Sequence, residues 1–405
     1  MVKLRIGTSC WSARAPTHTY PKLRGTHHAD IAVVGGGITG CLAAYAFARA
    51  GFSVVLIEAS RIGRGSTIAS TALLMQEPDV DFRDLAARYG SARTRAIWTQ
   101  STNSVRGLTA LIRDLRIRAA LEDVASVYWT AHTRVARDLQ RELDRRQRAG
   151  FGGRWLNPRA LKRQIGVDGA GGILTMGNAQ IDPYRACLGI AAHLRKDRVK
   201  VFDRTRVKRV RGSAQGVTIE LDDGQVRAAW AVIATGYATP EFKPLAGRFR
   251  MSKTYVIATA PIDHRTHRNL GSGAMWWDTE TPYHYSRWTA DRRMILGGRD
   301  LSGPSRRARP VVLAQQARRL ETDLVSLYPT LEGTAIDFAW EGLFATTRDG
   351  LPYIGTHPRY PRQIFALGYG GNGMTFGFLA AEVLLRTVLN RATDVDRFLG
   401  FSRMR

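Results

Sequence analysis

The chain has 405 residues, of which 44% are hydrophobic and 23% are charged, and its formal net charge is +26. This length suits two domains, and the apolar share is too high for a disordered chain. No apolar run approaches the roughly eighteen residues of a membrane span, and the amino-terminal residues lack the apolar core of a signal peptide. These features exclude an integral membrane helix and predict a cytoplasmic globular protein.

The positive charge comes mainly from arginines that are spread from Arg61 to Arg405. A basic surface attracts nucleic acid, anionic lipid or acidic substrates. Because the excess is not gathered in one tail, the sequence argues against a nucleic-acid partner, while peripheral contact with a membrane stays open. The three cysteines, Cys10, Cys41 and Cys187, lack the spacing of metal ligands, so we expect no metal site.

The strongest local pattern ends at the acidic residue Glu58. The apolar run Ile31–Val34 predicts a buried parallel strand, and the motif Gly35-Gly-Gly-Ile-Thr-Gly40 follows it directly. A helix is expected over 41–50, and a second strand over 52–57 leads to Glu58. A strand, a glycine turn, a helix, a strand and an acid in this order are typical of a dinucleotide-binding unit.

Each part of this unit has a physical role in holding a dinucleotide. Gly35 permits the tight turn, Gly37 lets the main chain approach a pyrophosphate, and Gly40 lets the helix pack closely on the sheet. The helix amino terminus offers free N–H groups to the phosphates. Glu58 has the spacing of the carboxylate that accepts the ribose hydroxyl groups.

Two further segments carry groups that suit a flavin nucleotide. Residues 65–73 are rich in small and hydroxyl side chains, namely Ser66, Thr67, Ser70 and Thr71. Near the carboxyl terminus, an expected strand over 363–367 leads through the glycine-rich residues 368–374 into an expected helix over 375–389. A glycine loop at a helix start attracts anions, so this loop would suit the pyrimidine end of a reduced flavin.

The middle of the chain changes from helical to strand patterns. Apolar spacing predicts helices over 81–117, 131–149 and 310–328. Strands are expected over 199–202 and 231–236, and a hairpin with its turn at Asp223-Gly224 is expected over 216–230. Between 251 and 300 the expected strands are aromatic and contain Tyr255, Trp276, Trp277, Tyr283, Tyr285 and Trp288. Such an antiparallel sheet would cover a flat ring system.

Three separated blocks resemble the D-amino acid oxidase family of flavoproteins, in particular its glycine or sarcosine oxidase-like and γ-glutamylputrescine oxidase-like members. They are the glycine motif with its flanks, residues 65–72, and the run Trp340-x-Gly342…Asp349-Gly-x-Pro352-x-x-Gly355 that continues to Gly373. The leader from Trp11 to Leu23 is similar as well, so the resemblance covers nearly the whole chain.

The resemblance implies a mixed α/β (α+β) fold in which a Rossmann-type FAD-binding domain is interleaved with an antiparallel-sheet substrate domain. The implied FAD-binding domain comprises residues 1–80, 165–245 and 335–405, and the substrate domain comprises residues 81–164 and 246–334.

The same resemblance implies FAD as the cofactor. Members that attach flavin covalently use a cysteine or histidine beside the ring, and neither occurs within 65–74 or 368–377, so we expect non-covalent FAD. The residues implied to surround FAD are Gly35, Gly37, Ile38, Gly40, Glu58, Ala59, Ser66, Thr67, Ser70, Thr71, Val207, Ala234, Gly236, Gly342, Gly370, Asn372, Gly373 and Met374.

One departure from the family bears on the substrate. Many amino-acid-oxidising members place an arginine at the position of Phe344, where it fixes the substrate carboxylate, and phenylalanine cannot form that bidentate contact. Unless Arg287 or Arg348 substitutes for it, an amine with its carboxylate elsewhere, or with none, is favoured. The expected substrate contacts are Tyr283, His284, Tyr285 and Arg287. His284 is either a base that keeps the amine neutral or a hydrogen-bonded core residue.

The functional hypothesis is oxidation of a C–N bond in a small amine or amino acid by hydride transfer to flavin N5. The imine would then be hydrolysed, and O2 would reoxidise the flavin with formation of H2O2. Three alternatives stay open. A dehydrogenase would pass electrons to a membrane quinone or a protein acceptor, a tRNA-modifying flavoprotein would bind RNA in a salt-sensitive way, and a flavin-binding protein without catalysis would not be reduced by any amine.

Overall fold

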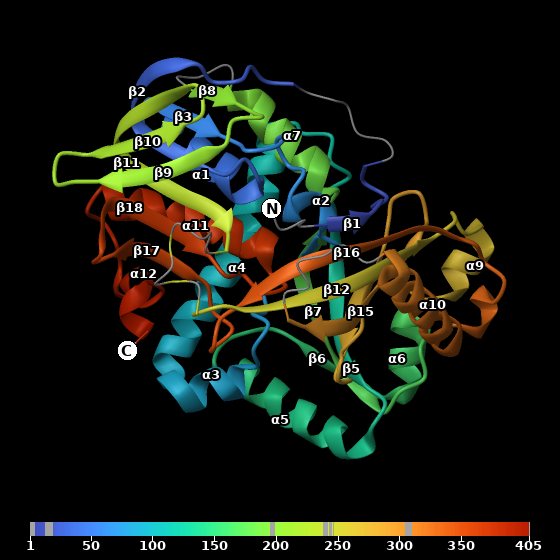
Figure 1. Ribbon diagram of the computed structural model, residues 1–405. Coiled ribbons are helices and arrows are strands. Elements are labelled where there is room, and N and C mark those ends of the chain that lie inside the picture. The colour runs from blue at the N-terminus through green and yellow to red at the C-terminus, as the bar shows by residue number, and fades with distance from the viewer. Residues whose placement is uncertain are drawn as a thin grey trace.

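The computed structural model describes residues 5–12, 19–194, 199–237, 242, 245, 247–303 and 310–404. They fold around one β-sheet of eight strands and another of ten. In Figure 1 the eight-stranded sheet occupies the upper part, and the ten-stranded sheet extends through the lower right. Two sheets with helices packed on them confirm the predicted mixed α/β fold class.

The eight-stranded sheet is built on buried parallel strands. Its main order is β17-β18-β11-β2-β3-β8; the strands from β18 to β8 are parallel, and β17 is antiparallel. Every residue of β3 is buried, as a continuous apolar run predicts for a parallel strand covered on both faces. The bounds are β2 Gly25–Val34, β3 Val54–Ile57, β8 Val199–Phe202, β11 Gly224–Gly236, β17 Tyr353–His357 and β18 Tyr360–Leu367.

Different elements cover the two faces of this sheet. Apolar side chains of one face pack against the helices α1 (Ile38–Arg49), α7 (Pro183–Leu194) and α11 (Gly373–Val388). The opposite face packs against β10 (Val217–Leu221), which pairs with β9 (Val207–Gly212) and with β11. The predicted hairpin is therefore present, but its return strand and the predicted strand 231–236 form one strand, β11.

The ten-stranded sheet is mostly antiparallel. Its order is β1-β16-β12-β15-β14-β13-β5-β7-β4, and β6 pairs with β7. The helix α10 (Pro310–Leu327) covers one face through Leu313, Leu320 and Leu324. The strands are β1 Arg5–Gly7, β4 Leu73–Leu74, β5 Glu122–Thr130, β6 Arg154–Leu156, β7 Gly171–Gln180, β12 Arg250–Thr259, β13 Met275–Asp278, β14 Tyr285–Trp288, β15 Met294–Ser302 and β16 Ile336–Thr346.

The remaining helices differ from the sequence prediction in one respect. The expected helix over 81–117 is two helices, α3 (Phe82–Tyr89) and α4 (Ser91–Asp114), because Gly90 between them adopts a φ of +80° that cannot continue a helix. The helix α5 (Thr133–Arg148) lies where it was expected. The short helices are α2 Ser66–Ala69, α6 Pro158–Ile165, α9 His264–Asn269 and α12 Asp394–Phe398.

Some strands from the segments assigned to the FAD-binding domain belong to the ten-stranded sheet. Both β7 and β16 belong to the ten-stranded sheet, although residues 165–245 and 335–405 were assigned to the FAD-binding domain. The amino-terminal strand β1 likewise pairs with β16. The domain assignment stays a prediction, since sheet membership alone does not define a domain.

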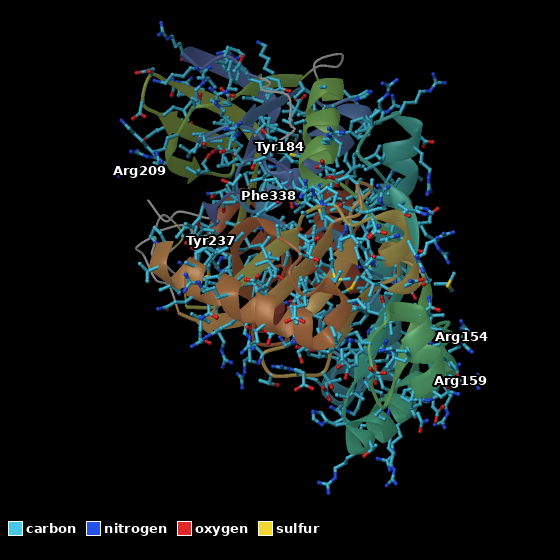
Figure 2. The ribbon with its side chains drawn as sticks, turned by 90° about the vertical axis from the view of Figure 1, so that its right-hand side faces the viewer. Arg154, Arg159, Tyr184, Arg209, Tyr237 and Phe338 are labelled. Atoms are coloured by element: carbon cyan, nitrogen blue, oxygen red, sulfur yellow. The ribbon has the colours of Figure 1, made fainter. Side chains whose placement is uncertain are left out.

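Basic side chains project from opposite ends of the molecule. Figure 2 shows Arg209 at the edge of the eight-stranded sheet, and Arg154 and Arg159 at the far end near α6. The positive charge is therefore distributed in space as it is in the sequence. Among the described residues, no helix combines the length and the apolar composition that crossing a membrane requires.

Candidate functional site

Three distant stretches meet at the carboxyl ends of the central parallel strands. Strand β2 leads into Gly35, β11 ends at Gly236, and β18 leads into Gly368. The Gly368 N–H donates to the Gly236 carbonyl oxygen at 3.0 Å. A Cβ on Gly35 would lie 2.5 Å from the Ala234 carbonyl oxygen, so only glycine fits between the two strands. The edge of a parallel sheet where strands meet in this way is a preferred ligand-binding position.

The turn after β2 has the close approach that its glycines predict. Gly35 has a φ of +110°, and a Cβ on Gly40 would lie 1.8 Å from the Gly35 carbonyl oxygen. The first turn of α1 can therefore lie directly against the turn that precedes it. The Thr67 hydroxyl accepts the Ile38 N–H at 2.9 Å, which places α2 beside the amino terminus of α1. Main-chain and hydroxyl groups thus converge where a pyrophosphate would bind.

Glu58 is held in a fixed orientation at the end of β3. One carboxylate oxygen accepts the Gly36 N–H at 2.7 Å, and the other accepts the Ser60 N–H at 2.7 Å. Burial raises the pKa of Glu58, while these two hydrogen bonds act in the opposite direction. Each carboxylate oxygen has a second lone pair, so both remain able to accept a ribose hydroxyl group. The arrangement fits the ADP-ribose part of FAD.

Val207 follows the segment that adjoins Glu58. The Thr205 N–H donates to the Glu58 carbonyl oxygen at 2.9 Å, and β9 begins two residues later at Val207. Ala59 and Ser66 are both exposed to solvent. These positions agree with an adenine end near β9, and their role in binding FAD remains a prediction.

The main chain of residues 69–72 is anchored by three side chains from elsewhere. Trp340 Nε1 donates to the Ala69 carbonyl oxygen at 2.9 Å, and Trp11 Nε1 donates to the Ser70 carbonyl oxygen at 2.8 Å. A Cβ on Gly342 would lie 3.7 Å from Ala69 Cβ, so β16 passes close to α2 at this glycine. The predicted flavin-lining segment is therefore fixed against the ten-stranded sheet.

Arg287 is the third anchor, and the structure gives it a role that the sequence did not predict. Its guanidinium group donates to the carbonyl oxygens of Thr71, Ala72 and Ile181 at 2.8–3.0 Å, and the residue is 2% exposed. Ala72 has a φ of +55°, so the guanidinium group supports a strained turn. Because these carbonyl groups engage the buried guanidinium group, the structure favours an anchoring role for Arg287 over the expected substrate contact.

The carboxyl-terminal glycine loop is bonded to residues 75–79. Asn372 Nδ2 donates to the Glu77 carbonyl oxygen at 2.7 Å, and the Gly371 N–H donates to Asp79 Oδ2 at 2.6 Å. Asn372 is the residue before α11, and Met374 in the first turn is buried. A Cβ on Gly370 would lie 2.4 Å from Asp79 Oδ2. Gly370, Asn372, Gly373 and Met374 thus lie together at a helix amino terminus, as predicted.

Tyr285 is the first residue of β14 in the ten-stranded sheet, and Tyr283 lies two residues before it. Their ring centroids are 5.6 Å apart, and the Tyr285 hydroxyl group lies 2.9 Å from the Thr254 hydroxyl group. Thr254 pairs in register with Gly342, whose Cα faces Ala69. Tyr285 therefore lies on the sheet face that turns toward the predicted flavin segment, and the Tyr283 ring lies beside it.

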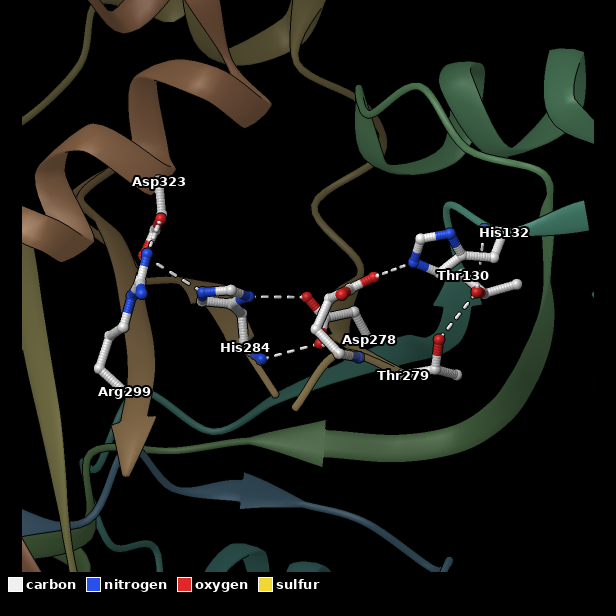
Figure 3. A network of polar contacts seen from close by, with 8 residues as sticks. Thr130, His132, Asp278, Thr279, His284, Arg299 and Asp323 are labelled. Atoms are coloured by element: carbon white, nitrogen blue, oxygen red, sulfur yellow. Dashed lines mark hydrogen bonds and ion pairs between the residues drawn. The ribbon is translucent and has the colours of Figure 1, made fainter. Parts of the chain in front are cut away.

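His284 lies in an ion-pair network with two carboxylates (Figure 3). Its Nδ1 lies 2.8 Å from Asp278 Oδ2, and its Nε2 lies 3.2 Å from Asp323 Oδ2. Burial lowers the pKa of His284, but the hydrogen bonds to Asp278 and Asp323 outweigh burial and raise it to about 9. The imidazolium donates through both nitrogens and has no lone pair for a proton. This arrangement favours the alternative of a hydrogen-bonded core residue over that of a base near neutral pH.

The sequence did not identify Asp79, Thr254 or Asp300 as candidates. Asp79 occupies an unpatterned loop, and Asp300 lies near the end of a strand, where an acid is usually a solvated residue. No local motif includes them. Their proximity to the site arises only when residues 75–79, β12 and β15 come together.

Comparisons with known proteins agree with this geometry. A family model described as FAD dependent oxidoreductase matches residues 30–386. The chain is 26% identical to gamma-glutamylputrescine oxidoreductase of Escherichia coli (strain K12), over 93% of this chain and 86% of that protein. It is 24% identical to glycine oxidase of Bacillus licheniformis, over 93% of this chain and 97% of that protein.

The solved structure of L-proline dehydrogenase from P. horikoshii has a similar fold. The two structures superpose with a TM-score of 0.80, and the match covers 95% of this chain and 100% of the L-proline dehydrogenase chain. The sequences are 18% identical. At that identity the likeness establishes the fold alone.

A substitution at Gly40 tests the dinucleotide turn. We expect Gly40→Ala to displace the turn, because its Cβ would lie 1.8 Å from the Gly35 carbonyl oxygen. The purified variant should carry much less FAD, and its free energy of unfolding should fall by about 2–3 kcal/mol. Gly152→Ala is the matched control, since a Cβ there meets nothing within 4 Å. A Gly40→Ala protein with a full complement of FAD would contradict the assignment.

The His284 network predicts a specific dependence of stability on pH. Folding raises the pKa of His284 from 6.5 to about 9, so its stabilising contribution is complete below about pH 6.5 and is lost as the pH rises through about 9. The difference in unfolding free energy between the wild type and His284→Gln should therefore shrink over this range in urea titrations. His132→Gln, at a 61% exposed side chain, should show only a small difference. A difference that grows with pH would refute the imidazolium.

Proposed function

Because the chain belongs to the family of FAD-dependent oxidoreductases, we propose that it oxidises a C–N bond of a small amine or amino acid to an imine, which water hydrolyses. The observation that carries this proposal is the meeting of the three glycine-bearing stretches beside an aromatic sheet face. The relatives named gamma-glutamylputrescine oxidoreductase and glycine oxidase support an amine or amino acid as the substrate class.

The chain's own groups would hold FAD at both of its ends. When bound, FAD accepts the two electrons and the hydrogen that leave the C–N bond. Gly35, Gly37 and Gly40 with the amino terminus of α1 would bind the pyrophosphate. The first N–H groups of α11 would stabilise negative charge at the pyrimidine end, because a helix amino terminus carries a partial positive charge. The roles of the other predicted residues stand as part of this proposal.

The aromatic face would orient the substrate and exclude water. Tyr285 is 7% exposed, and its ring lies over Gly297, where a Cβ would be 2.2 Å from the ring. Burial raises the pKa of Tyr283 well above its ordinary value, so its hydroxyl group stays protonated and can donate a hydrogen bond. Together the two rings would form an apolar wall with two hydroxyl groups.

The substrate contacts differ from those of an enzyme that clamps a carboxylate. Phe344 is half-buried on β16 and pairs in register with Ser252, so its position offers a ring where many relatives would offer a guanidinium group. Arg287 is bonded to the main chain, and Arg348 is exposed. We therefore propose an amine whose carboxylate lies away from Phe344, or which has none.

The remaining parts of the proposal concern the proton and the electron acceptor. Because His284 is held as an imidazolium, the amine would bind in its neutral form from the fraction present in solution. We propose O2 as the acceptor and H2O2 as the second product.

Anaerobic mixing tests this function. The purified protein with bound FAD is mixed with alkylamines, glycine, sarcosine, D-alanine and L-proline, and the absorbance of oxidised flavin is followed. We expect at least one amine to bleach it, and air to restore it with one H2O2 formed per carbonyl product.

Three outcomes would contradict parts of this function. If no amine bleached the flavin, C–N oxidation would be refuted. Reoxidation by a quinone but not by air would refute O2 as the acceptor. Bleaching by carboxylate-bearing amino acids alone would refute the role given to Phe344.

A further inference from the structure

Two carboxylates adjoin the aromatic wall of the proposed substrate site. Asp79 accepts the Gly371 N–H at 2.6 Å through Oδ2, which places it at the carboxyl-terminal glycine loop. Asp300 lies on β15 beside Thr254, whose hydroxyl group bonds to it and also contacts the Tyr285 hydroxyl group at 2.9 Å. The two acids thus approach the tyrosines from the loop side and from the sheet side.

Both acids are desolvated by the surrounding protein. Burial raises the pKa of Asp79 to about 6 and also raises that of Asp300, and the negative charge of Asp300 adds to the effect on Asp79. The two residues differ in exposure, since Asp79 is exposed and Asp300 is half-buried. Asp300 Oδ1 is buried and accepts no hydrogen bond. A buried carboxylate oxygen without a donor is costly, so a donor from a ligand would stabilise it.

Neither acid has a cationic partner among the residues that the structure describes. Other buried acids do: Glu341 pairs with Lys253 at 2.7 Å, and Asp349 pairs with Arg403 at 2.6 Å. The absence of such a pair is unexpected in a chain with a net charge of +26. The two carboxylates therefore place unpaired negative charge inside a basic protein, and this charge attracts cations.

Two further features favour a cation at this place. Tyr283 lies close enough to both Asp79 and Asp300 for their charges to raise its pKa, after burial, which is the larger cause. Aromatic rings beside carboxylates attract ammonium groups. Glu77 is 2% exposed, keeps Oε1 without a hydrogen-bond partner, and is bonded through its carbonyl oxygen to Asn372 in the same glycine loop.

There is space beside Asp79 for part of a ligand. Asp79 and Gly370 line a cavity of about 350 Å³ that extends toward residues 346–350, and the described lining residues do not include Asp300, Tyr283 or Tyr285. Arg88 and Arg348 also line this cavity, but Arg88 is engaged with the Arg348 carbonyl oxygen, and neither arginine pairs with Asp79.

We propose that Asp79 and Asp300 bind a second, cationic amino group of the substrate, so that the enzyme oxidises the C–N bond at the other amino group of an alkyl diamine or polyamine. This inference rests on the proposed C–N oxidation and names its substrate class. The carbon next to the neutral amino group would lose its hydride at the flavin, while the distant ammonium group donates to the two carboxylates. Asp79 and Asp300 are specificity-determining residues in this scheme.

Matched pairs of amines test the proposal. Each of the diaminoalkanes from 1,3-diaminopropane to 1,6-diaminohexane is compared with the monoamine of equal length in anaerobic flavin reduction. We expect the better diamines to reach half-maximal reduction at a concentration lower by at least about tenfold, because a charge-assisted hydrogen bond to a buried carboxylate is a strong interaction.

Variants identify the residues responsible. Asp79→Asn and Asp300→Asn should each bring the ratio of the half-maximal concentrations for monoamine and diamine close to one, and this ratio does not change when a variant affects both amines equally through the flavin loop. Asp84→Asn is the matched control, because its 51% exposed side chain lines the same cavity but pairs with Arg83. FAD content and the thermal midpoint of unfolding confirm that each variant is folded. If one Asn variant fails to fold, the proposal is still tested by the other variant and by the ratio of the half-maximal concentrations for monoamine and diamine in the wild type.

The outcomes separate this inference from the broader function. If monoamines or amino acids reduce the flavin as well as diamines do, the cation site is refuted and C–N oxidation stands. An undiminished diamine advantage in both Asn variants also refutes it. If no amine of any class reduces the bound flavin, both proposals fail.

Discussion

The close approach of β2 and β11 at their carboxyl ends is the constraint on which the site depends. The main chain at Gly35 lies so near the Ala234 carbonyl oxygen that no side chain fits, and the Gly236 carbonyl oxygen in turn accepts the Gly368 N–H. Parallel pairing forces all three strand ends to the same edge of the sheet. Strand order therefore brings the local glycine motif together with residues more than 300 positions away, a meeting that no local motif encodes.

The second sheet is attached to this edge by buried donors. Arg287, Trp11 and Trp340 bring N–H groups to carbonyl oxygens of residues 69–72, a segment that would otherwise carry unpaired polar groups in the interior. Burial lowers the pKa of Arg287 to about 10, which leaves the guanidinium group charged near neutral pH. These contacts fix the distance between the aromatic sheet face and the predicted flavin segment, and hence the depth available to a substrate.

Charge is arranged differently on the surface and in the interior. Arginines such as Arg154 and Arg209 project outward and account for the basic exterior (Figure 2). At the proposed site, Asp79 and Asp300 lie near each other with no cationic partner among the described residues, whereas Asp323 is paired with both Arg299 and His284. Although burial raises the pKa of Asp323, these partners outweigh it and hold the pKa near 2, so Asp323 stays ionised. The net positive charge of the chain therefore does not predict the charge of the ligand that Asp79 and Asp300 would attract.

The sequence by itself determined the elements whose signals are local. The strand, glycine turn, helix and second strand between Ile31 and Ile57 depend on neighbouring residues, so their spacing predicted these elements correctly, while the ribose contact of Glu58 stays a prediction. The glycine loop before α11 was found for the same reason. The strands β5 and β7 were not identified, because they lie between helices and β7 contains glycines whose place in a sheet is set by partner strands.

Only the tertiary structure decided the roles of individual polar side chains. His284 became an imidazolium because Asp323 approaches from α10, and Arg287 became an anchor because Thr71, 216 positions away, turns its carbonyl oxygen inward. Asp79 and Asp300 became a pair because a loop and a strand end meet. Ionisation and hydrogen bonding depend on distance in space, and sequence spacing does not report that distance beyond a single element.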